Sequence, residues 1–316
     1  MTPMNTNDLQ MLATRTRFMR EAGVALVLAS LVLGVFLFVP LDSKQTPTVA
    51  VTTPDTPNAF ANVPLKAKAA IVYDLATKKV LYAKNADAQL PLASLTKLLT
   101  VYGALSTLSP NTPITVSAKA ASAEAPHTFT PGDTLALSEM ARITLTASLN
   151  DGAAAIAETT ANAKHETTST MMAGVAQSLS LSQTYAVNGN GLDANAEVSG
   201  GYGSAYDMAV LAGALLQKAP SIALATTGST TQAVGENGKV YTVKNTNHNV
   251  GNTPRLLLSK TGFTDLAGGN LAVVFDAGIE HPVAIVVLGS TEEARFTDSQ
   301  ALVAATLAQF SGLSTL

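Results

Sequence analysis

The sequence has 316 residues, of which 47% are hydrophobic and 13% are charged, so it can bury a sizeable core and has no long charged tracts. A net charge of −3 gives no basic footprint for a nucleic acid, and the lack of cysteine excludes disulfides and thiolate metal sites. The histidines lack metal-ligand spacing, so we predict no bound metal and place all four on the surface or in loops: His127, His165, His248 and His281.

The N-terminal region has the pattern of a membrane anchor. Residues 1–21 are polar and carry three arginines, and residues 22–40 contain an uncharged apolar run of 18 positions. As a helix this run would span about 27 Å, close to the hydrocarbon thickness of a bilayer. The arginines predict a cytoplasmic N-terminus and place the rest of the chain outside. A cleaved signal peptide is the alternative, but the run is longer than a usual signal core and lacks a small-x-small site.

The remaining chain divides into a linker and a globular domain. Residues 41–64 are rich in Thr and Pro and predict an extended tether, whereas residues 65–316 have globular patterning. Predicted elements follow in chain order: a strand hairpin over 68–74 and 78–85, a helix over 92–105, a loop over 110–131, mostly helix over 134–216, a hairpin over 230–244 turning at Asn237-Gly238, strands over 255–262, 270–278 and 282–289, and a closing helix over 292–310. This order predicts an α/β fold of the α+β type with antiparallel connections and a separate helical lobe.

The helix over 92–105 carries the first candidate site. Its apolar residues recur at the three-and-four spacing of one buried face, and Ser94 precedes Lys97 by three positions. Residues three apart on a helix lie about 5–6 Å apart at Cβ, so a hydroxyl and an amine share one face. A serine acyl-transfer enzyme with a lysine base needs such a pair. Taken alone, the tetrapeptide is more often a capping serine with a solvated lysine.

Two further motifs strengthen the functional interpretation of Ser94 and Lys97. Ser148-Leu149-Asn150 lies at a break between helical segments, and Lys260-Thr261-Gly262 ends an apolar strand. Each is weak by itself, since such tripeptides usually belong to turns and strand ends. With Ser94-Leu95-Thr96-Lys97 they form, in this order and on these element types, the set found in β-lactamases and penicillin-binding proteins.

The chain here resembles the D-alanyl-D-alanine carboxypeptidases of the low-molecular-weight penicillin-binding proteins. The resemblance covers most of residues 67–310 and includes the segments VNGNGLD, SAYDMAVLA and KNTN. It implies a β-lactamase/transpeptidase-like fold, in which an antiparallel sheet flanked by helices meets an all-helical lobe at the active site. No metal or organic cofactor is implied.

The resemblance also implies a role for each motif residue. Ser94 would be the acylating nucleophile, and Lys97 would be its base once burial and the nearby cation Lys260 had lowered the pKa of its amine. Ser148 would relay a proton toward the leaving amine. The implied substrate-binding residues are Asn150 for the substrate amide, Lys260 and Thr261 for the terminal carboxylate, Gly262 for close backbone approach, and Phe263, whose backbone N–H would join that of Ser94 in an oxyanion hole.

Two positions depart from the family pattern. Leu149 stands where the family commonly has a small residue, and Ser259 precedes the lysine of the third motif where other local variants are more usual. Neither change removes a reacting group. We expect Leu149 to narrow the cleft and shift substrate preference.

The sequence therefore predicts a single-pass membrane protein with an extracytoplasmic serine D,D-carboxypeptidase domain that acts on peptidoglycan stem peptides and is acylated by β-lactams. A D,D-endopeptidase with the same residues is the alternative. A β-lactamase is disfavoured because no dedicated deacylating glutamate is identifiable, and Glu158 and Glu166 are predicted to be surface residues of the helical lobe. A non-catalytic wall-binding protein is disfavoured because all the reacting side chains are retained.

Overall fold

The computed structural model describes residues 16–17, 19–24, 26–28 and 58–312, and the chain divides into two units, Met1–Asp55 and Thr56–Leu316. The described residues of the first unit are helical, and Arg17 forms an ion pair with Glu21 at 3.5 Å. Within the described ranges, no helix combines the length and the apolar composition needed to cross a membrane. Most of the predicted anchor at 22–40, much of the segment 1–21 and linker residues 41–57 lie outside the described residues, so these assignments stay predictions.

The second unit begins before the predicted boundary at residue 65. Ala59 and Phe60 are buried, and the Phe60 ring stacks on Tyr82 with 5.6 Å between centroids. The backbone N–H of Ala59 donates to Oε1 of Gln309 at 3.1 Å. The end of the predicted linker is therefore packed against the domain.

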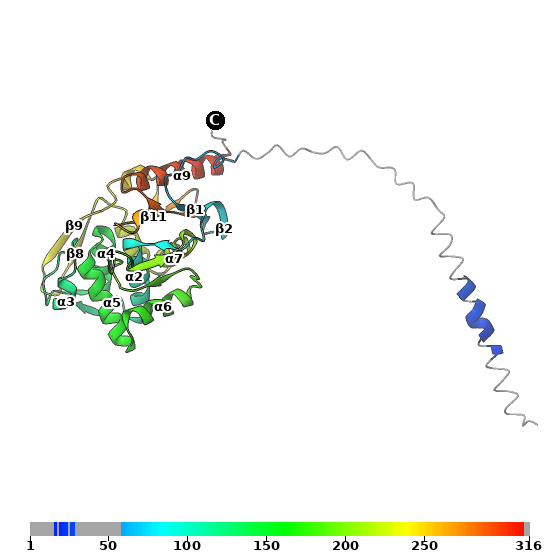
Figure 1. Cartoon of the computed structure of the whole chain (residues 1–316), viewed down its shortest axis with the longest axis horizontal. Coiled ribbons are helices and arrows are strands. Elements are labelled where there is room, and N and C mark those ends of the chain that lie inside the picture. Colours follow the sequence, from blue (N-terminus) through cyan, green and yellow to red (C-terminus); the bar gives the residue numbers. More distant parts are fainter. Residues whose placement is uncertain (1–15, 18, 25, 29–57, 313–316) are drawn as a thin grey trace, which may run out of the picture. The chain divides into compact units, whose positions relative to one another are not determined.

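A five-stranded antiparallel sheet forms the centre of this unit (Figure 1). Its spatial order is β10-β11-β12-β1-β2. The strands are β1 (Ala69–Asp74), β2 (Lys79–Lys84), β10 (Leu256–Thr264), β11 (Gly268–Asp276) and β12 (Pro282–Ser290). Side chains alternate between faces along each strand, so Ile71 enters one core cluster while Ala70 and Val72 enter another. Both faces of the sheet are therefore buried at its central strands, which explains the long apolar runs of β1, β11 and β12.

Helices cover the two faces of the sheet. The closing helix α9 (Ala294–Ser311) packs on β11 and β12 and completes the smaller core cluster with Phe296, Leu302 and Val303. The opposite face contacts α7 (Ala205–Lys218), behind which lies the helical lobe. Figure 1 shows α9 at one end of the unit and α3, α5 and α6 at the other.

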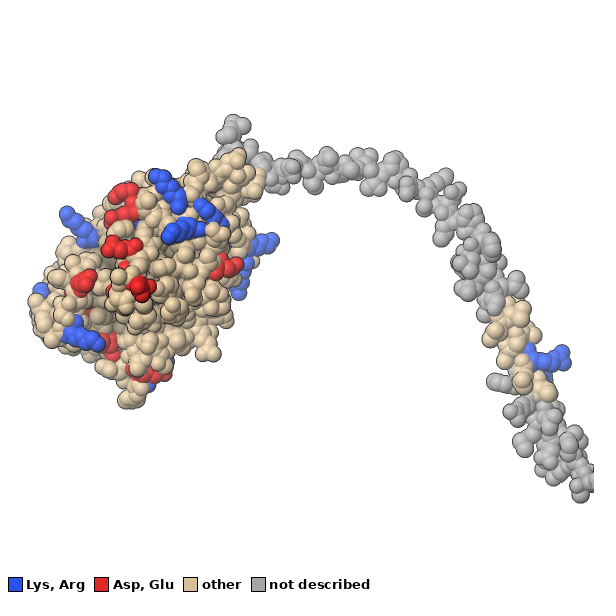
Figure 2. Space-filling model, in the orientation of Figure 1, with Lys and Arg blue, Asp and Glu red and all other residues tan. Residues whose placement is uncertain are grey.

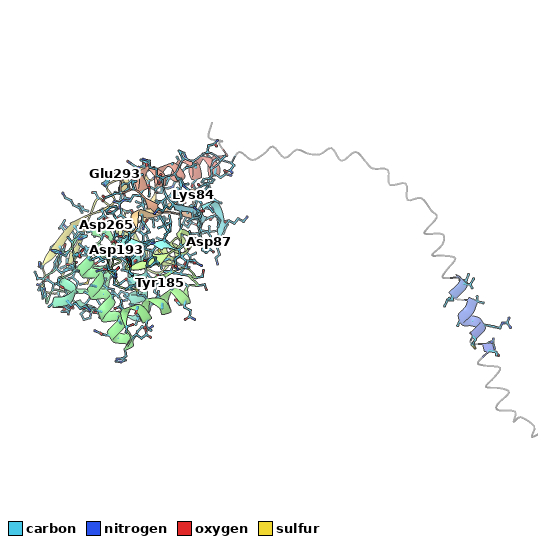
Figure 3. All side chains as sticks on the ribbon, in the orientation of Figure 1. Lys84, Asp87, Tyr185, Asp193, Asp265 and Glu293 are labelled. Carbon is cyan, nitrogen blue, oxygen red and sulfur yellow. The ribbon has the colours of Figure 1, made fainter. Side chains whose placement is uncertain are left out.

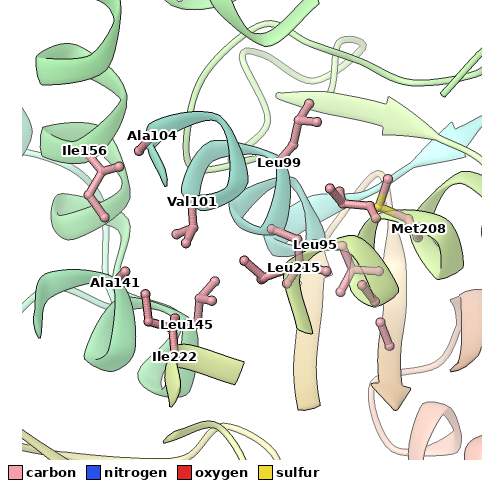
Figure 4. Packing of buried hydrophobic residues seen from close by; sticks show 14 of the residues in the cluster. Leu95, Leu99, Val101, Ala104, Ala141, Leu145, Ile156, Met208, Leu215 and Ile222 are labelled. Atoms are coloured by element: carbon pink, nitrogen blue, oxygen red, sulfur yellow. The ribbon is translucent and has the colours of Figure 1, made fainter. Parts of the chain in front are cut away.

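The helical lobe is organised around the helix that carries Lys97. Helix α2 (Thr96–Thr107) follows a 3-10 turn at Ala93–Leu95, and Figure 4 shows Leu95, Leu99 and Val101 reaching toward different neighbouring helices. The other helices are α3 (Ala118–Ala121), α4 (Leu137–Ala147), α5 (Asn150–Lys164), α6 (Thr168–Ser178) and α8 (Pro220–Ala225). The strand hairpins, the helix-rich middle and the closing helix agree with the sequence prediction.

Short strands complete the fold. They are β3 (Leu90–Pro91), β4 (Pro113–Thr115), β5 (Thr134–Ala136), β6 (Tyr185–Ala186), β7 (Gly201–Gly203), β8 (Thr230–Val234) and β9 (Val240–Lys244), and a second 3-10 turn spans Val250–Asn252. The predicted hairpin at Asn237-Gly238 is β8–β9, and Gly238 has the positive φ of +79° that its turn requires. The predicted loop over 110–131 was wrong in part, because it contains β4 and α3. These elements are too short for periodicity to reveal. On the face shown in Figure 2, acidic and basic side chains are scattered over a mostly uncharged surface.

Candidate active site

The nucleophile candidate lies on a tight turn that two glycines approach. Ala93 adopts a left-handed φ of +48°, which costs a residue with a Cβ about 1–2 kcal/mol, and Ser94 follows it. A β-carbon added to Gly262 would lie 2.9 Å from the Leu92 carbonyl oxygen and 3.2 Å from the Ser94 nitrogen. A β-carbon on Gly191 (φ +79°) would overlap the Ala93 carbonyl. Ser94 is thus enclosed by backbone from the third motif and from the VNGNGLD segment.

The Lys97 amine is completely buried and held by three hydrogen bonds. Its Nζ lies 2.7 Å from Ser94 Oγ, 2.7 Å from Asn150 Oδ1 and 2.6 Å from the Asn190 carbonyl oxygen. Burial lowers the pKa of Lys97 to about 7, although the carboxylate of Asp151 acts in the opposite direction. A large neutral fraction at neutral pH equips this amine to accept the proton of the Ser94 hydroxyl.

The second motif sits at the junction of α4 and α5. Ser148 ends α4 in the left-handed conformation (φ +59°), and its Oγ accepts a hydrogen bond from Lys260 Nζ at 2.9 Å. Asn150 begins α5, and its Nδ2 donates to the carbonyls of Glu124 and Ala125 at 3.0 Å each. A substrate contact by Asn150 must therefore use the free lone pair of Oδ1, and that contact stays a prediction.

Leu149 does not behave as expected. Its side chain is 2% exposed and belongs to the hydrophobic core of the helical lobe. Because it points into the core, the expectation that it narrows the cleft has no support in the structure.

The third motif places a second buried amine next to the first. Lys260 is 1% exposed and donates to Ser148 Oγ and, at 2.7 Å, to the Thr261 carbonyl. Burial, followed by the positive charges of Lys97 and Arg295, holds the pKa of Lys260 well below its usual range. The predicted coupling of the two amines therefore acts on Lys260, whereas burial is what lowers the pKa of Lys97.

The other residues of the third motif surround this amine. The Thr261 and Thr246 hydroxyls share a hydrogen bond of 2.6 Å, which brings the KNTN segment into the site. Gly262 allows β10 to approach the nucleophile turn, whereas its predicted role in close approach to the substrate stays a prediction. The Phe263 side chain is 45% exposed on the same strand. The proposed roles in carboxylate binding and in the oxyanion hole stay predictions.

Three residues of the site were absent from the predicted set, although Asn190 lies in the VNGNGLD segment. Asp151 is fully buried, and its Oδ2 accepts the N–H groups of Thr128 and Phe129 at 2.6 and 2.7 Å, which fixes the loop ahead of α5. Asn190 offers only its backbone to Lys97. Arg295, 6% exposed, donates through Nη1 to the Gly262 carbonyl at 2.9 Å.

Asp193 connects the helical lobe to the sheet beside this site. Its Oδ1 accepts from Thr264 Oγ1 at 3.0 Å, and its Oδ2 accepts from the Leu266 N–H at 3.3 Å. Figure 3 shows Asp193 and Asp265 close together on the exposed face. These two hydrogen bonds of Asp193 connect the loop that contains Gly191 to the turn that follows β10.

The histidines serve structural contacts in two cases. The His248 ring packs on Phe296 with 4.4 Å between centroids, and His281 Nε2 lies 2.7 Å from Asp74 Oδ2. Across the described residues, no three His, Asp or Glu side chains gather as a metal ion would require.

Comparison with known proteins gives the family. A family model described as D-alanyl-D-alanine carboxypeptidase matches residues 53–292. The chain belongs to this family. It is 32% identical over 237 residues to the D-alanyl-D-alanine carboxypeptidase DacF of Bacillus subtilis. The matched region is 73% of this chain and 59% of that protein. It is 31% identical over 248 residues to a D-alanyl-D-alanine endopeptidase of Pseudomonas aeruginosa, covering 76% of this chain and 78% of that protein.

Solved structures of the carboxypeptidase family and its relatives share the fold. Penicillin-binding protein D2 of Listeria monocytogenes, solved with cefotaxime bound, superposes with a TM-score of 0.66 at 26% identity, covering 78% of this chain and 98% of that one. A D-alanyl-D-alanine carboxypeptidase of Mycobacterium tuberculosis gives a TM-score of 0.68 at 24% identity, covering 81% and 94%. The predicted β-lactamase/transpeptidase-like fold is thus confirmed.

Proposed function

We propose that this chain is a serine D,D-carboxypeptidase that removes the terminal D-alanine from peptidoglycan stem peptides. The observation that carries the proposal is the fully buried amine of Lys97, which lies 2.7 Å from Ser94 Oγ and is joined to the second motif through Asn150. Membership of the carboxypeptidase family supports the substrate class. The chain spans 59% of the length of DacF, so the comparison bears on the catalytic part of that relative.

The proposed reaction begins with acylation of Ser94. The neutral Lys97 amine takes the hydroxyl proton as Oγ attacks the carbonyl carbon of the penultimate D-alanine. The negative charge that develops on the carbonyl oxygen is stabilised by the backbone N–H groups of Ser94 and Phe263. The peptide C–N bond then breaks, the proton passes through Ser148 to the leaving amine, and free D-alanine departs.

The lysine of the third motif serves both binding and turnover in this scheme. The Lys260 amine and the Thr261 hydroxyl bind the terminal carboxylate of the substrate, and the negative charge of that carboxylate favours the protonated form of the amine. Water then attacks the acyl ester while Lys97 accepts one of its protons, and this proton passes to Ser94 Oγ as the ester C–O bond breaks. The shortened peptide leaves as a carboxylic acid and the Ser94 hydroxyl is restored.

Intact-protein mass spectrometry after incubation with benzylpenicillin tests the acylation step. We expect one adduct of the mass of the penicillin, mapped to the peptide that contains Ser94, and no adduct on Ser94→Ala. Release of D-alanine from acetyl-Lys-D-Ala-D-Ala, followed in parallel, should disappear in the same variant. An adduct on any other residue would contradict the mechanism.

A D,D-endopeptidase is the second candidate, favoured by the similarity to the Pseudomonas aeruginosa endopeptidase. Both reactions use the same acyl donor and differ only in the leaving amine. Purified uncrosslinked and crosslinked muropeptides, incubated separately and analysed by chromatography, distinguish the two activities. Faster cleavage of the crosslinked dimer would replace the carboxypeptidase assignment.

The penicillin and peptide assays also separate the carboxypeptidase from a β-lactamase and from a non-catalytic binding protein. Rapid hydrolysis of penicillin in place of a stable adduct would indicate a β-lactamase. Unchanged processing of cell-wall peptides by Ser94→Ala would indicate a non-catalytic binding protein.

We also propose that residues 22–40 anchor the chain in the cytoplasmic membrane, with residues 1–21 inside and the catalytic unit outside. The apolar run and its preceding arginines support this topology. Fractionation of cells followed by protease treatment of intact spheroplasts provides the test. Recovery of the full-length chain in the soluble fraction, or protection of residues 58–312 from protease, would overturn the topology.

A further inference from the structure

A cavity lies in the helical lobe, next to the Lys97 site. It has a volume of about 510 Å³ and lies between α3, α5, the first turn of α6 and residues 187–190. Figure 1 shows α3, α5 and α6 grouped at this end of the unit. Nothing in the mechanism above uses this space.

The walls of the cavity continue into the catalytic residues. Asn190 lines it, and the carbonyl of the same residue accepts the hydrogen bond from Lys97. Ser122 and Ala123 line it on the other side, directly before the two carbonyls that accept from Asn150. The proposed reaction places the leaving D-alanine at Lys260 and Thr261, so we place the acyl half of the substrate on the side of Asn150 and Asn190, next to this cavity.

The cavity has an acidic group in its wall. The Glu158 side chain is 28% exposed and its Oε2 accepts a hydrogen bond from Ser117 Oγ at 2.7 Å. Its cationic neighbour Lys119 is 4.0 Å away and 89% exposed, so this ion pair is weak and solvated. The carboxylate keeps lone pairs for a second cation. Hydroxyl groups of Thr168 and Ser169 line the same space.

The distance from the nucleophile selects the part of the substrate that can reach this carboxylate. Asn150 and Glu158 are eight residues apart on α5, which is about 12 Å along the helix. Two residues of extended peptide span about 7 Å, and a long side chain covers the remainder. A group on the acylating D-alanine itself is too short.

We propose that this cavity is a subsite for an ammonium-bearing side chain on the residue that precedes the acylating D-alanine, with Glu158 as its counter-ion. The inference rests on the proposed function, because it assumes that Ser94 is acylated by a peptide. It assigns the cavity a role in choosing among peptides that end in the same D-Ala-D-Ala.

Two synthetic peptides test the subsite. They are acetyl-Lys-D-Ala-D-Ala with a free ε-amine and the same peptide with that amine acetylated. We expect the wild-type chain to prefer the free amine in kcat/KM by about threefold to tenfold, the size of one partly exposed ion pair. Glu158→Gln should remove this preference and leave kcat/KM for the acetylated peptide unchanged.

Glu166→Gln is the matched control, since Glu166 has a similar exposure of 32% in the same lobe but pairs with Lys164 at 3.3 Å. It should keep the wild-type preference. Equal rates for both peptides in the wild type, or a preference that survives in Glu158→Gln, would overturn the subsite while the benzylpenicillin adduct on Ser94 still formed. Absence of both the adduct and D-alanine release would instead overturn the proposed function.

Discussion

At the scale of the residue, the buried amine of Lys97 sets the pH dependence of acylation. Burial lowers the pKa of this amine to about 7, so it is protonated and inactive as a base below that pH and neutral above it. We expect the second-order rate of penicillin acylation to fall about tenfold for each pH unit below 7 and to level off above it. Stopped-flow or quenched labelling between pH 5 and 9 measures this profile. A rate that is flat across this range would exclude Lys97 as the base.

A substitution at Asn150 is expected to shift the pH dependence of acylation. Its Oδ1 lies 2.7 Å from the Lys97 amine, so Asn150→Asp would place a negative charge there, and its second oxygen would replace the amide that donates to the Glu124 and Ala125 carbonyls. An opposite charge at this distance raises the pKa of an amine by about one to three units. The acylation profile should therefore shift to higher pH, with at least about fivefold slower labelling at pH 7.

Asn195→Asp is the control for this change. Asn195 is exposed, and among the contacts that the structure gives, its side chain bonds only to backbone N–H groups of its own loop, at Glu197 and Val198. It should leave the profile in place. An equal shift in both variants would mean that net charge, and not the contact with Lys97, causes the effect.

The sequence was sufficient to predict that the three motifs share one site but not which other residues hold them there. The helical repeat predicts that Ser94 and Lys97 share a face, and the three motifs identify their partners. The carbonyl of Asn190 is 93 positions from Lys97, and any residue type could supply it. Arg295 contacts Gly262 across 33 positions from a helix with no distinctive pattern. Such contacts depend on tertiary packing, which local patterns do not encode.

At the scale of the element, the contact between β10 and the nucleophile turn depends on a missing side chain. A methyl group at Gly262 would lie 2.9 Å from the Leu92 carbonyl oxygen, and backbone cannot yield as a flexible side chain does. Gly262→Ala should push β10 away from Ser94 and slow acylation by about a hundredfold, the usual effect of a misplacement near 1 Å.

The rate of benzylpenicillin labelling and circular dichroism, measured together, separate this effect from unfolding. Gly251→Ala is the matched control, because a β-carbon there meets nothing within 4 Å. We expect it to label at the wild-type rate. Wild-type labelling by Gly262→Ala would show that the strand and the turn are not in the close contact described.

Elements with a long periodic pattern agree with the sequence prediction, and short ones do not. The nine-residue strands β10, β11 and β12 contain long apolar runs because most positions on both of their faces are buried. The three-residue strand β4 and the four-residue helix α3 complete less than one period of any pattern. They form because β5 and α5 pack against them.

At the scale of the whole molecule, the catalytic unit includes residues that looked like linker. Phe60 is 5% exposed and stacks on Tyr82, so its truncation empties part of the smaller core. Phe60→Ala should lower the free energy of unfolding by about 3 kcal/mol and the melting temperature by about 6–12 °C.

Thermal unfolding followed by circular dichroism checks this value, and penicillin labelling at 25 °C should be unaffected. Val80→Ala, at a side chain 47% exposed on β2, serves as the control and should change the melting temperature little. An unchanged melting temperature in Phe60→Ala would return residues 58–64 to the linker. Composition predicted a tether over residues 41–64 because Thr and Pro are the commonest residues of that range, and the apolar residues near its end did not alter that average.

The two glycines beside Ser94 restrict where this chain can accept substitutions near its site. Gly191 and Gly262 press main chain against the nucleophile turn from opposite segments, and neither position has room for a larger residue. Substitutions at Gly191 and Gly262 therefore cannot supply new substrate selectivity. It has to be acquired farther out, on surfaces such as α5 and residues 187–190, where substitutions leave the reacting atoms in place.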